Sequence, residues 1–250
     1  MRAFATLLRR EFSAYFLSLT GYVIISAVLL LIGLSFLLML RAFNNDTLNA
    51  PLTEGFYSVM FFWLILLLAG PLITMRLFAQ EKATGTFETL MTAPVSDRQV
   101  VLAKYTAALG FYVVTWLPLL PCLLVVHRYT SSGAPFEWGP TASTGLGILL
   151  IGSVFVSLGC LASALTRSQM IAATVSLAFG VGFFLLSFLK YTVTSHSGWF
   201  ARAAARLSLI EHMEDFARGV VDTRPVVLYL TLTAFFLFLT LKAVEGRRWR

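Results

Sequence analysis

The sequence predicts an all-α, polytopic membrane protein with six transmembrane helices. Of its 250 residues, 58% are hydrophobic and only 12% are charged, and the mean hydropathy is +0.82. Soluble globular domains carry about 25% charged residues, so this chain lies outside the soluble class. The apolar residues also gather into six runs of 17 to 22 residues, each close to the roughly 20 needed to cross a bilayer as a helix. Residues 1–250 are therefore expected to form a single membrane domain.

Residues 2–18 are expected to form an amphipathic helix that lies on the membrane surface. One side carries the basic residues Arg2, Arg9 and Arg10. The other side carries apolar residues at helical spacing, namely Phe4, Leu8, Phe12 and Tyr15. A signal peptide is the competing interpretation. The next apolar run, 19–40, would span about 33 Å as a helix, which is too long for a cleaved h-region. This run is therefore predicted to be the first transmembrane helix.

The other five spans are predicted over 56–75, 105–126, 144–165, 169–189 and 225–241. Six spans place both termini on one side of the membrane. Of the 19 Lys and Arg residues, twelve lie on this side and seven lie on the other. The positive-inside rule then predicts that both termini, and the polar loop 78–105, are cytoplasmic.

The loop 78–105 contains a short predicted helix between two helix breakers. Gly85 and Pro94 enclose residues 86–93, which can form only about two helical turns. Three apolar side chains share one face of this helix at positions i, i+3 and i+4, namely Phe87, Leu90 and Met91. A partner surface, or the bundle itself, has to cover this face.

Capping signals mark where the helices of this loop begin. Thr86 is a plausible N-cap, and the Glu88 carboxylate lies in the first turn, where it complements the helix dipole. After Pro94, Ser96 and Gln99 have the spacing of a capping box, which predicts the start of the helix that becomes the third span.

Two segments of the chain form a recognisable pattern. The first is the charged pair Glu81 and Lys82, the stretch GTFETLMTAPVS, and Lys104 at the entrance to a hydrophobic run. The second is SLIEHMEDFARGVVDTRPVVLYL, followed by the last span and an Arg-rich tail. Together with the number of spans, these patterns resemble the type-2 ABC exporter permeases, and among them the permeases of gliding-motility and copper-processing gene clusters.

This resemblance implies that the loop contains a coupling helix, which seats in a groove of an ATPase subunit. The residues expected to dock the ATPase are Glu81, Thr86, Phe87, Glu88, Leu90, Met91 and Pro94. It also implies an assembly of two ABC ATPase chains, which carry ATP and Mg, and two permease chains, either a homodimer or a pair with a similar paralogue. The location would be the bacterial cytoplasmic (inner) membrane. The permease itself would bind no cofactor.

An amphipathic helix is predicted between the fifth and sixth spans, on the outer side. Ser208 and Glu211 have the spacing of a capping box, and Gly219 is a natural C-terminal stop. The apolar face consists of Leu209, Met213 and Phe216. The resemblance implies that such outer helices roof the translocation path, which makes this segment the candidate outer gate helix.

Small residues mark candidate packing faces in two spans. Glycines recur at intervals of seven in the fourth span, at Gly145, Gly152 and Gly159, and small residues line one side of the fifth span, at Ala173, Ser176 and Gly180. Such residues let transmembrane helices approach closely. These faces are expected either to pack within the chain or to meet a second copy across a dimer axis, and the sequence does not decide between the two.

Several classes of function find no support in the sequence. The six predicted spans contain no Asp, Glu, Lys, Arg or His, whereas ion-coupled transporters usually keep such groups at membrane depth. There is no GxxxxGK[ST] phosphate loop, no HExxH and no GxSxG, so the chain is not expected to be an enzyme. Cys122 and Cys160 lack metal-ligand spacing, and no metal site is expected. The basic residues flank apolar runs instead of forming one patch, so nucleic acid is not an expected partner.

The function predicted from these observations is that of a permease subunit that couples ATP hydrolysis by a separate ATPase to substrate translocation, most simply export. An alternative is a non-transporting scaffold that relays the motion of the ATPase to a periplasmic accessory protein. A third possibility is a stand-alone membrane protein without an ATPase. The sequence does not identify a substrate.

Overall fold

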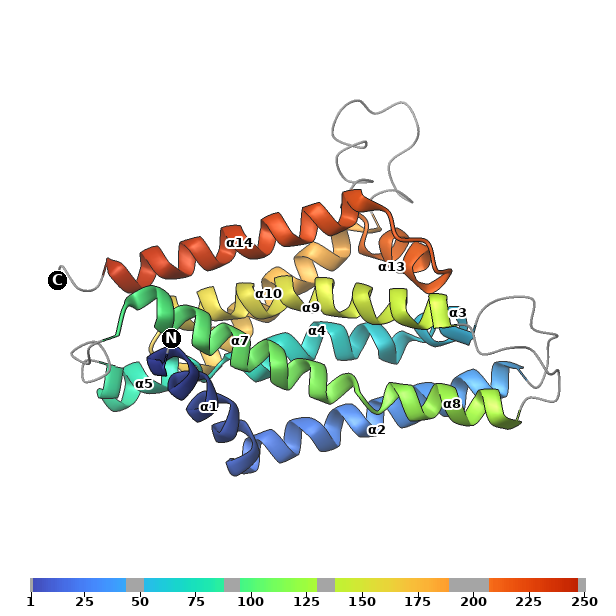
Figure 1. Ribbon diagram of the computed structural model, residues 1–250, viewed down its shortest axis with the longest axis horizontal. Coiled ribbons are helices and arrows are strands. Elements are labelled where there is room, and N and C mark those ends of the chain that lie inside the picture. The colour runs from blue at the N-terminus through green and yellow to red at the C-terminus, as the bar shows by residue number, and fades with distance from the viewer. Residues whose placement is uncertain (1, 44–51, 88–94, 130–137, 189–206, 247–250) are drawn as a thin grey trace.

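The computed structural model describes residues 2–43, 52–87, 95–129, 138–188 and 207–246, and in these ranges it contains helices and no strand. The helices form an elongated bundle (Figure 1). In chain order they are α1 (Arg2–Leu17), α2 (Leu19–Phe43), α3 (Leu52–Tyr57), α4 (Met60–Thr74), α5 (Ala79–Thr84), α7 (Asp97–Trp116), α8 (Leu119–Tyr129), α9 (Trp138–Leu165), α10 (Gln169–Leu186), α13 (Leu209–Ala217) and α14 (Thr223–Glu245).

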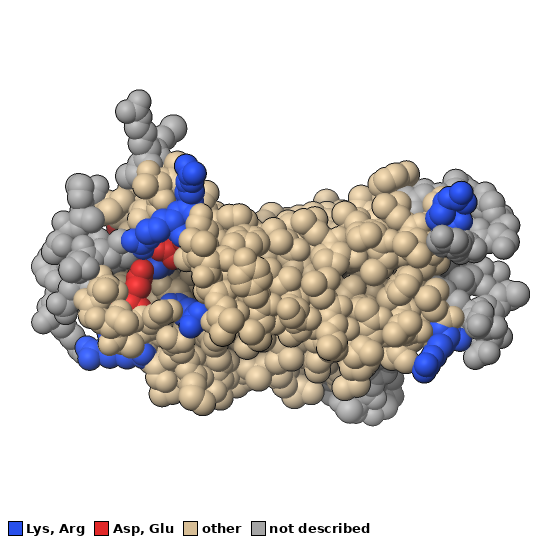
Figure 2. Space-filling view, turned by 90° about the horizontal axis from the view of Figure 1, so that it is seen from below, with Lys and Arg blue, Asp and Glu red and all other residues tan. Residues whose placement is uncertain are grey.

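Six helical segments are long and apolar enough to cross a membrane, which confirms the predicted fold class. They are Leu19–Arg41, Met60–Thr84, Asp97–Arg128, Trp138–Leu165, Gln169–Leu186 and Thr223–Glu245. Figure 2 shows Lys and Arg at both ends of the visible face, and between them a broad band without charged side chains. A band of this kind fits the hydrocarbon core of a bilayer.

The central helix of the bundle is α9, and 83% of its most apolar stretch is buried inside the chain. Two of its glycines let neighbouring helices approach closely. A Cβ atom at Gly152 would lie 2.2 Å from Cε1 of Tyr112, and one at Gly159 would lie 2.0 Å from Oγ1 of Thr74. At Gly145, in contrast, a Cβ atom would meet nothing within 4 Å. Two of the three regularly spaced glycines thus serve packing within the chain.

The third span is divided into α7 and α8 at Leu117 and Pro118. Proline has no backbone N–H, and its ring displaces the carbonyl of the preceding turn, so a helix usually breaks or bends there. The second segment, Met60–Thr84, is also divided, because α4 ends at Thr74 and α5 begins at Ala79. Pro118 and Pro121 in the sequence predict a kink in the third span, and the break at Pro118 agrees with this prediction.

The two ends of the bundle carry different elements (Figure 1). At one end lie α1, α5, the start of α7 and the last turns of α14; we call this the α5 end. At the other end lie α3, α13 and the end of α8; we call this the α13 end. The predicted amphipathic helix over 2–18 is α1, and it crosses the bundle obliquely at the α5 end.

Candidate functional site

The loop 78–105, which we call the predicted docking loop, lies at the α5 end. Helix α5 stops at Gly85, whose φ of 76° is the left-handed conformation that glycine adopts without strain, and helical structure resumes at Thr86 and Phe87. The loop closes at Ser96, whose side chain accepts from the Gln99 backbone N–H while the Gln99 side chain accepts from the Ser96 backbone N–H. The predicted helix stop and capping box are therefore both present. Glu88, Leu90, Met91 and Pro94 lie outside the described residues.

Phe87 is covered by its own chain. Its side chain is buried, with an exposed fraction of 9%, and belongs to the main apolar core. The ammonium group of Lys82 lies 5.2 Å from the centre of the Phe87 ring and donates a hydrogen bond to the carbonyl oxygen of Ala164, at the end of α9. Of the three apolar residues predicted to face the ATPase, the one that the structure describes thus anchors the loop to the bundle.

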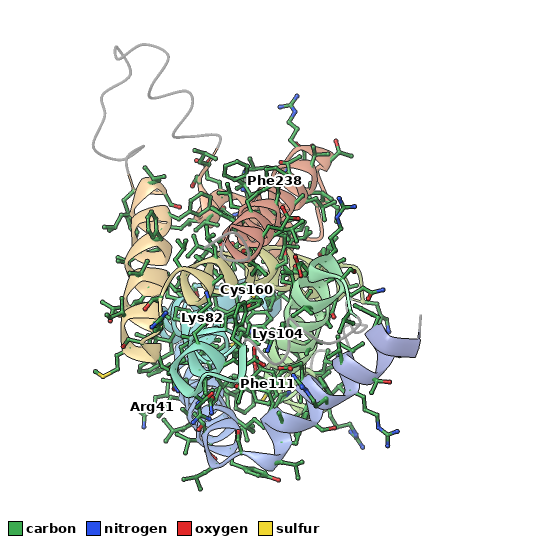
Figure 3. The ribbon with its side chains drawn as sticks, turned by 90° about the vertical axis from the view of Figure 1, so that its left-hand side faces the viewer. Arg41, Lys82, Lys104, Phe111, Cys160 and Phe238 are labelled. Atoms are coloured by element: carbon green, nitrogen blue, oxygen red, sulfur yellow. The ribbon has the colours of Figure 1, made fainter. Side chains whose placement is uncertain are left out.

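A second lysine joins three helices at the same end. Lys104 in α7 is only 2% exposed, and its Nζ lies 2.7 Å from Oε1 of Glu81 in α5 and 3.3 Å from Oε2 of Glu11 in α1. Nη2 of Arg10 completes the group, at 2.5 Å from Oε1 of Glu11 and 3.5 Å from Oε1 of Glu81. We call these four residues the Lys104 cluster. Figure 3, which faces the α5 end, shows Lys82 and Lys104 inside the bundle.

Aromatic contacts hold α1 against the bundle. The Tyr15 ring stacks on Phe111 of α7, with ring centres 4.5 Å apart, and its hydroxyl donates to the carbonyl oxygen of Ile73 at 3.0 Å. The Phe12 ring packs over Gly110, where an added Cβ would lie 3.2 Å from Cε2 of the ring. The predicted surface helix is consequently fixed to α7 and α4 by specific packing.

The N-terminus of α5 is tied to the central helix α9. The hydroxyl oxygen of Ser163 accepts hydrogen bonds from the backbone N–H groups of Phe78 and Ala79, each at 3.0 Å. The same hydroxyl also lies 3.3 Å from the carbonyl oxygen of Met75. Together with the bond from Lys82 to Ala164, these contacts fasten both ends of α5 to the last turn of α9.

A pocket of about 480 Å³ with several charged lining residues lies between α1, the end of α4, α5 and α7. Its charged lining residues are Arg10, Glu11, Arg76, Glu81 and Lys104. The buried Oε2 atom of Glu81 has no hydrogen-bond partner within the described residues. The same ranges contain no group of three or more His, Cys, Asp or Glu residues that could hold a metal ion.

Sequence reasoning found only part of this site. Glu81 was singled out as a docking residue, and Lys104 was noted at the entrance to its span. Glu11 was not singled out, because it lies 70 residues before Glu81 and no local spacing connects the two. One signal was available: an acidic residue on an otherwise basic amphipathic helix predicts a cation in the surface that this helix covers.

The candidate outer gate helix, α13, lies at the opposite end of the bundle, with its predicted apolar residues buried. Leu209, Met213 and Phe216 are each at most 1% exposed. Ser208 caps the helix by accepting from the Glu211 backbone N–H, and Gly219 ends it with a φ of 86°. The predicted start, apolar face and stop of this helix therefore all appear.

Helix α13 is also bound to its neighbours through polar contacts. Ser143 of α9 donates to the carbonyl oxygen of Phe216 at 2.5 Å, and Thr53 of α3 donates to that of Ala217 at 2.6 Å. Nδ1 of His212 lies 2.8 Å from the Tyr229 hydroxyl in α14. Burial lowers the pKa of His212, despite nearby acidic side chains, so the ring is neutral at pH 7.

Two of the three residues on the predicted small-residue face of α10 pack inside the chain. Ser176 and Gly180 are buried, and Ala173 is half-buried. A Cβ atom at Gly180 would lie 3.3 Å from Cε1 of Phe155, and one at Gly159 would lie 3.1 Å from Oγ of Ser176. Ser176 and Gly180 thus face α9 of the same chain.

Comparisons with known proteins agree with this architecture. A sequence model of the family described as ABC-2 family transporter protein matches residues 19–187. The match covers about two thirds of the chain, including five of the six spans and the loop 78–105. A search of curated proteins found no match. This match identifies the family as a whole and does not assign the chain to the gliding-motility or copper-processing permeases. The chain is therefore a multi-pass membrane protein that belongs to the ABC-2 family of transporter proteins.

Proposed function

We propose that this chain is the membrane subunit of an ATP-driven exporter in the bacterial cytoplasmic membrane, and that residues 79–94 dock a separate ABC ATPase. The observation that carries the proposal is the way in which α5 is fastened. It contacts α9 through Ser163 and Ala164, α7 through Lys104, and α1 through the Lys104 cluster.

The mechanism follows from these attachments. Helix α5 is only six residues long and cannot bend far on its own. A force on the docking loop is therefore passed to the central helix α9, and through Lys104 to α7 and α1. ATP-driven closure of the ATPase would move these elements as a group and change which side of the membrane dimer is open.

Phe87 packs on its own bundle, so we infer that other residues of the loop make the contact with the ATPase. In the described part of the loop, Ala83, Thr84, Gly85 and Thr86 form a continuous exposed stretch. We infer that Phe87 fixes the position of the loop, and that residues 83–86 and 88–94 form the contact.

Replacing Phe87 with Ala and Glu88 with Lys in one chain should detach the ATPase. Phe87→Ala removes the side chain that packs the loop against the bundle, and Glu88→Lys reverses a charge of the predicted contact. Replacing a buried phenylalanine with alanine costs about 3–5 kcal/mol of packing, so we expect the loop to lose the position in which it meets the ATPase. We expect unchanged amounts of permease in the membrane, loss of co-purified ATPase and loss of permease-stimulated ATP hydrolysis.

The matched control for this experiment is Phe238→Ala with Glu245→Lys. Like the Phe87 ring, the Phe238 ring contacts a lysine, because Nζ of Lys242 lies 5.7 Å from its centre. Lys242 also pairs with Glu245. This control makes the same chemical changes at the same end of the bundle, outside the docking loop. Equal recovery of ATPase with both double variants would show that residues 79–94 are a structural loop only.

The orientation of the protein can be measured by thiol labelling. In a chain without Cys122 and Cys160, a cysteine at the exposed Ala83 should be protected from an impermeant reagent in intact cells, and one at the exposed Val220 should be labelled. The reason is the excess of Lys and Arg on the side of α5. Permeabilised cells should label both positions. Labelling of Ala83→Cys but not Val220→Cys in intact cells would place the docking loop outside.

We also propose that two permease chains, either identical or closely similar, assemble with two ATPase chains. Each permease has one docking loop, and an ATPase dimer offers two places to dock. Native mass spectrometry of the purified complex should therefore show two chains of each kind. A complex with a single permease chain would contradict this assembly.

A further inference from the structure

The pocket of about 480 Å³ at the α5 end has one more positive charge than negative charge in its lining. The cations are Arg10, Arg76 and Lys104, and the carboxylates are Glu11 and Glu81. Both carboxylates are already occupied in the Lys104 cluster, where Arg10 and Lys104 each pair with the two of them. Arg76, in contrast, bonds only to neutral side chains among the described residues. The excess charge therefore lies at Arg76, and the pocket is suited to one anion.

Arg76 also has hydrogen-bond donors without an acceptor. Its Nη1 donates to the Thr20 hydroxyl in α2, and its Nε donates to Oε1 of Gln169 at the start of α10, at 3.4 Å. Because a guanidinium group has five N–H donors, these two bonds leave three donors unpaired among the described residues. Nη2 carries two of the three, and its surface remains accessible. Arginine donors arranged in this way match the oxygens of a phosphate group.

One border of the pocket is apolar. Ser18 lines the pocket, and the residues on either side of it, Leu17 and Leu19, are 85% and 82% exposed. Met170 directly follows the Gln169 partner of Arg76 and is 81% exposed. In a protein that spans a membrane, apolar side chains with this exposure contact acyl chains, whereas arginine stays at the level of the headgroups. Arg76 is thus placed at the boundary between the membrane and water.

The other border of the pocket is polar. Gln80, Thr84 and Thr86 line it, and all three are exposed. Figure 2 shows acidic and basic side chains together at the α5 end of the visible face, next to the band without charge. The pocket therefore adjoins both apolar and polar surfaces, which is the arrangement that a phospholipid requires around its headgroup.

We propose that this pocket binds the headgroup of one anionic phospholipid, with the phosphodiester at Arg76 and the acyl chains along Leu17 and Leu19. A phosphodiester carries one negative charge, which equals the excess positive charge of the lining. The volume of the pocket lies within the range of about 300–1,000 Å³ that is typical of small-molecule sites. Basic pockets between transmembrane helices bind phospholipid headgroups in other membrane proteins.

Other occupants fit the pocket less well. Phosphatidylcholine would bring a quaternary ammonium group to a lining whose two carboxylates already pair with Arg10 and Lys104. A soluble phosphate, or a segment of the ATPase, would enter from water and would leave Leu17 and Leu19 uncovered beside the site. An anionic phospholipid satisfies both the charge at Arg76 and the apolar border.

The test is native mass spectrometry of the full-length protein in mild detergent, titrated with dioleoyl phosphatidylglycerol or dioleoyl phosphatidylcholine. Arg76→Gln removes the cation, and its control, Arg98→Gln, removes a positive charge from an exposed residue at the same end of the bundle, outside the pocket lining. A second pair leaves every charge in place. Ala14→Phe fills the pocket, and Ala5→Phe introduces the same side chain at another exposed position of α1.

We expect the parent to bind one phosphatidylglycerol in preference to phosphatidylcholine. Arg76→Gln should bind it roughly tenfold more weakly, the factor for the weaker hydrogen bonds to charged groups. Ala14→Phe should show a similar loss, and both controls should bind as the parent does. If Arg76→Gln does not fold, the comparison of Ala14→Phe with Ala5→Phe decides.

Equal affinity of Ala14→Phe and Ala5→Phe for phosphatidylglycerol would overturn the proposal. Displacement of the lipid by inorganic phosphate would also overturn it, because the pocket would then be a site for a soluble anion. If Ala14→Phe kept the lipid but lost the co-purified ATPase, the pocket would belong to the ATPase interface instead.

Discussion

Lys104→Met should destabilise the bundle by about 3–5 kcal/mol, the usual cost of removing one partner from a buried ion pair. Lys104 is 2% exposed, and the side chains of Glu11 and Glu81 are 14% and 19% exposed. Without the ammonium group, two carboxylates would remain close together, largely out of water, with only Arg10 to balance them. A change of this size corresponds to a fall of the midpoint of thermal unfolding on the order of 10 °C.

The measurement is thermal unfolding of the purified protein in mild detergent, combined with limited proteolysis of α1. Lys242→Met is the matched control, because Lys242 pairs with Glu245 at the same end of the bundle but is 57% exposed. Exposed pairs contribute about 0–1 kcal/mol, so this control should unfold near the parent temperature. A second substitution, Glu81→Gln, should recover part of the loss in Lys104→Met. Equal stability of the two lysine variants would show that the Lys104 cluster does not hold α1 and α5 in place.

Gly159→Val should weaken or prevent the packing of the central helix. A Cβ atom at this position would lie 2.0 Å from Oγ1 and 2.8 Å from Cβ of Thr74. Thr74 is fully buried, and its hydroxyl donates to the carbonyl oxygen of Gly70 at 2.8 Å, so the side chain cannot turn away. Either α4 or α9 has to shift. Extra volume in a packed core costs about 1–3 kcal/mol and sometimes more.

Gly145→Val is the internal control for this substitution, since it places the same residue in the same helix where nothing lies within 4 Å of the added Cβ. Both variants pay the same helix-propensity difference between Gly and Val. We therefore expect Gly145→Val to unfold near the parent temperature and Gly159→Val to unfold well below it or to aggregate on extraction. Similar unfolding temperatures would mean that α4 and α9 do not meet at this glycine.

The features that the sequence predicted correctly depend on short-range patterns. Hydropathy located the six spans, and cap residues located the turns at Gly85, Ser96, Ser208 and Gly219, because a cap and the backbone that it satisfies are only a few residues apart. The apolar spacing of α13 likewise predicted which of its residues are buried.

The features that the sequence did not predict are contacts between distant segments. Lys104 was seen as a flanking charge, although it pairs with residues 23 and 93 positions away. The Phe87 face was expected to be covered either by a partner or by the bundle itself, and the core of the same chain covers Phe87. In each case the sequence indicates that an apolar or charged group needs a partner, but only the tertiary arrangement decides which one it finds.

The fastening of α5 also has a consequence for biosynthesis. The oxygen that caps the start of α5 belongs to Ser163, which follows Ala79 by 84 residues. During translation at about 5–20 residues per second, α5 is therefore made several seconds before the residue that fixes its first turn. Until the fourth span is in place, the newly made loop lacks this support, so its final shape is reached only when the chain is most of the way through synthesis.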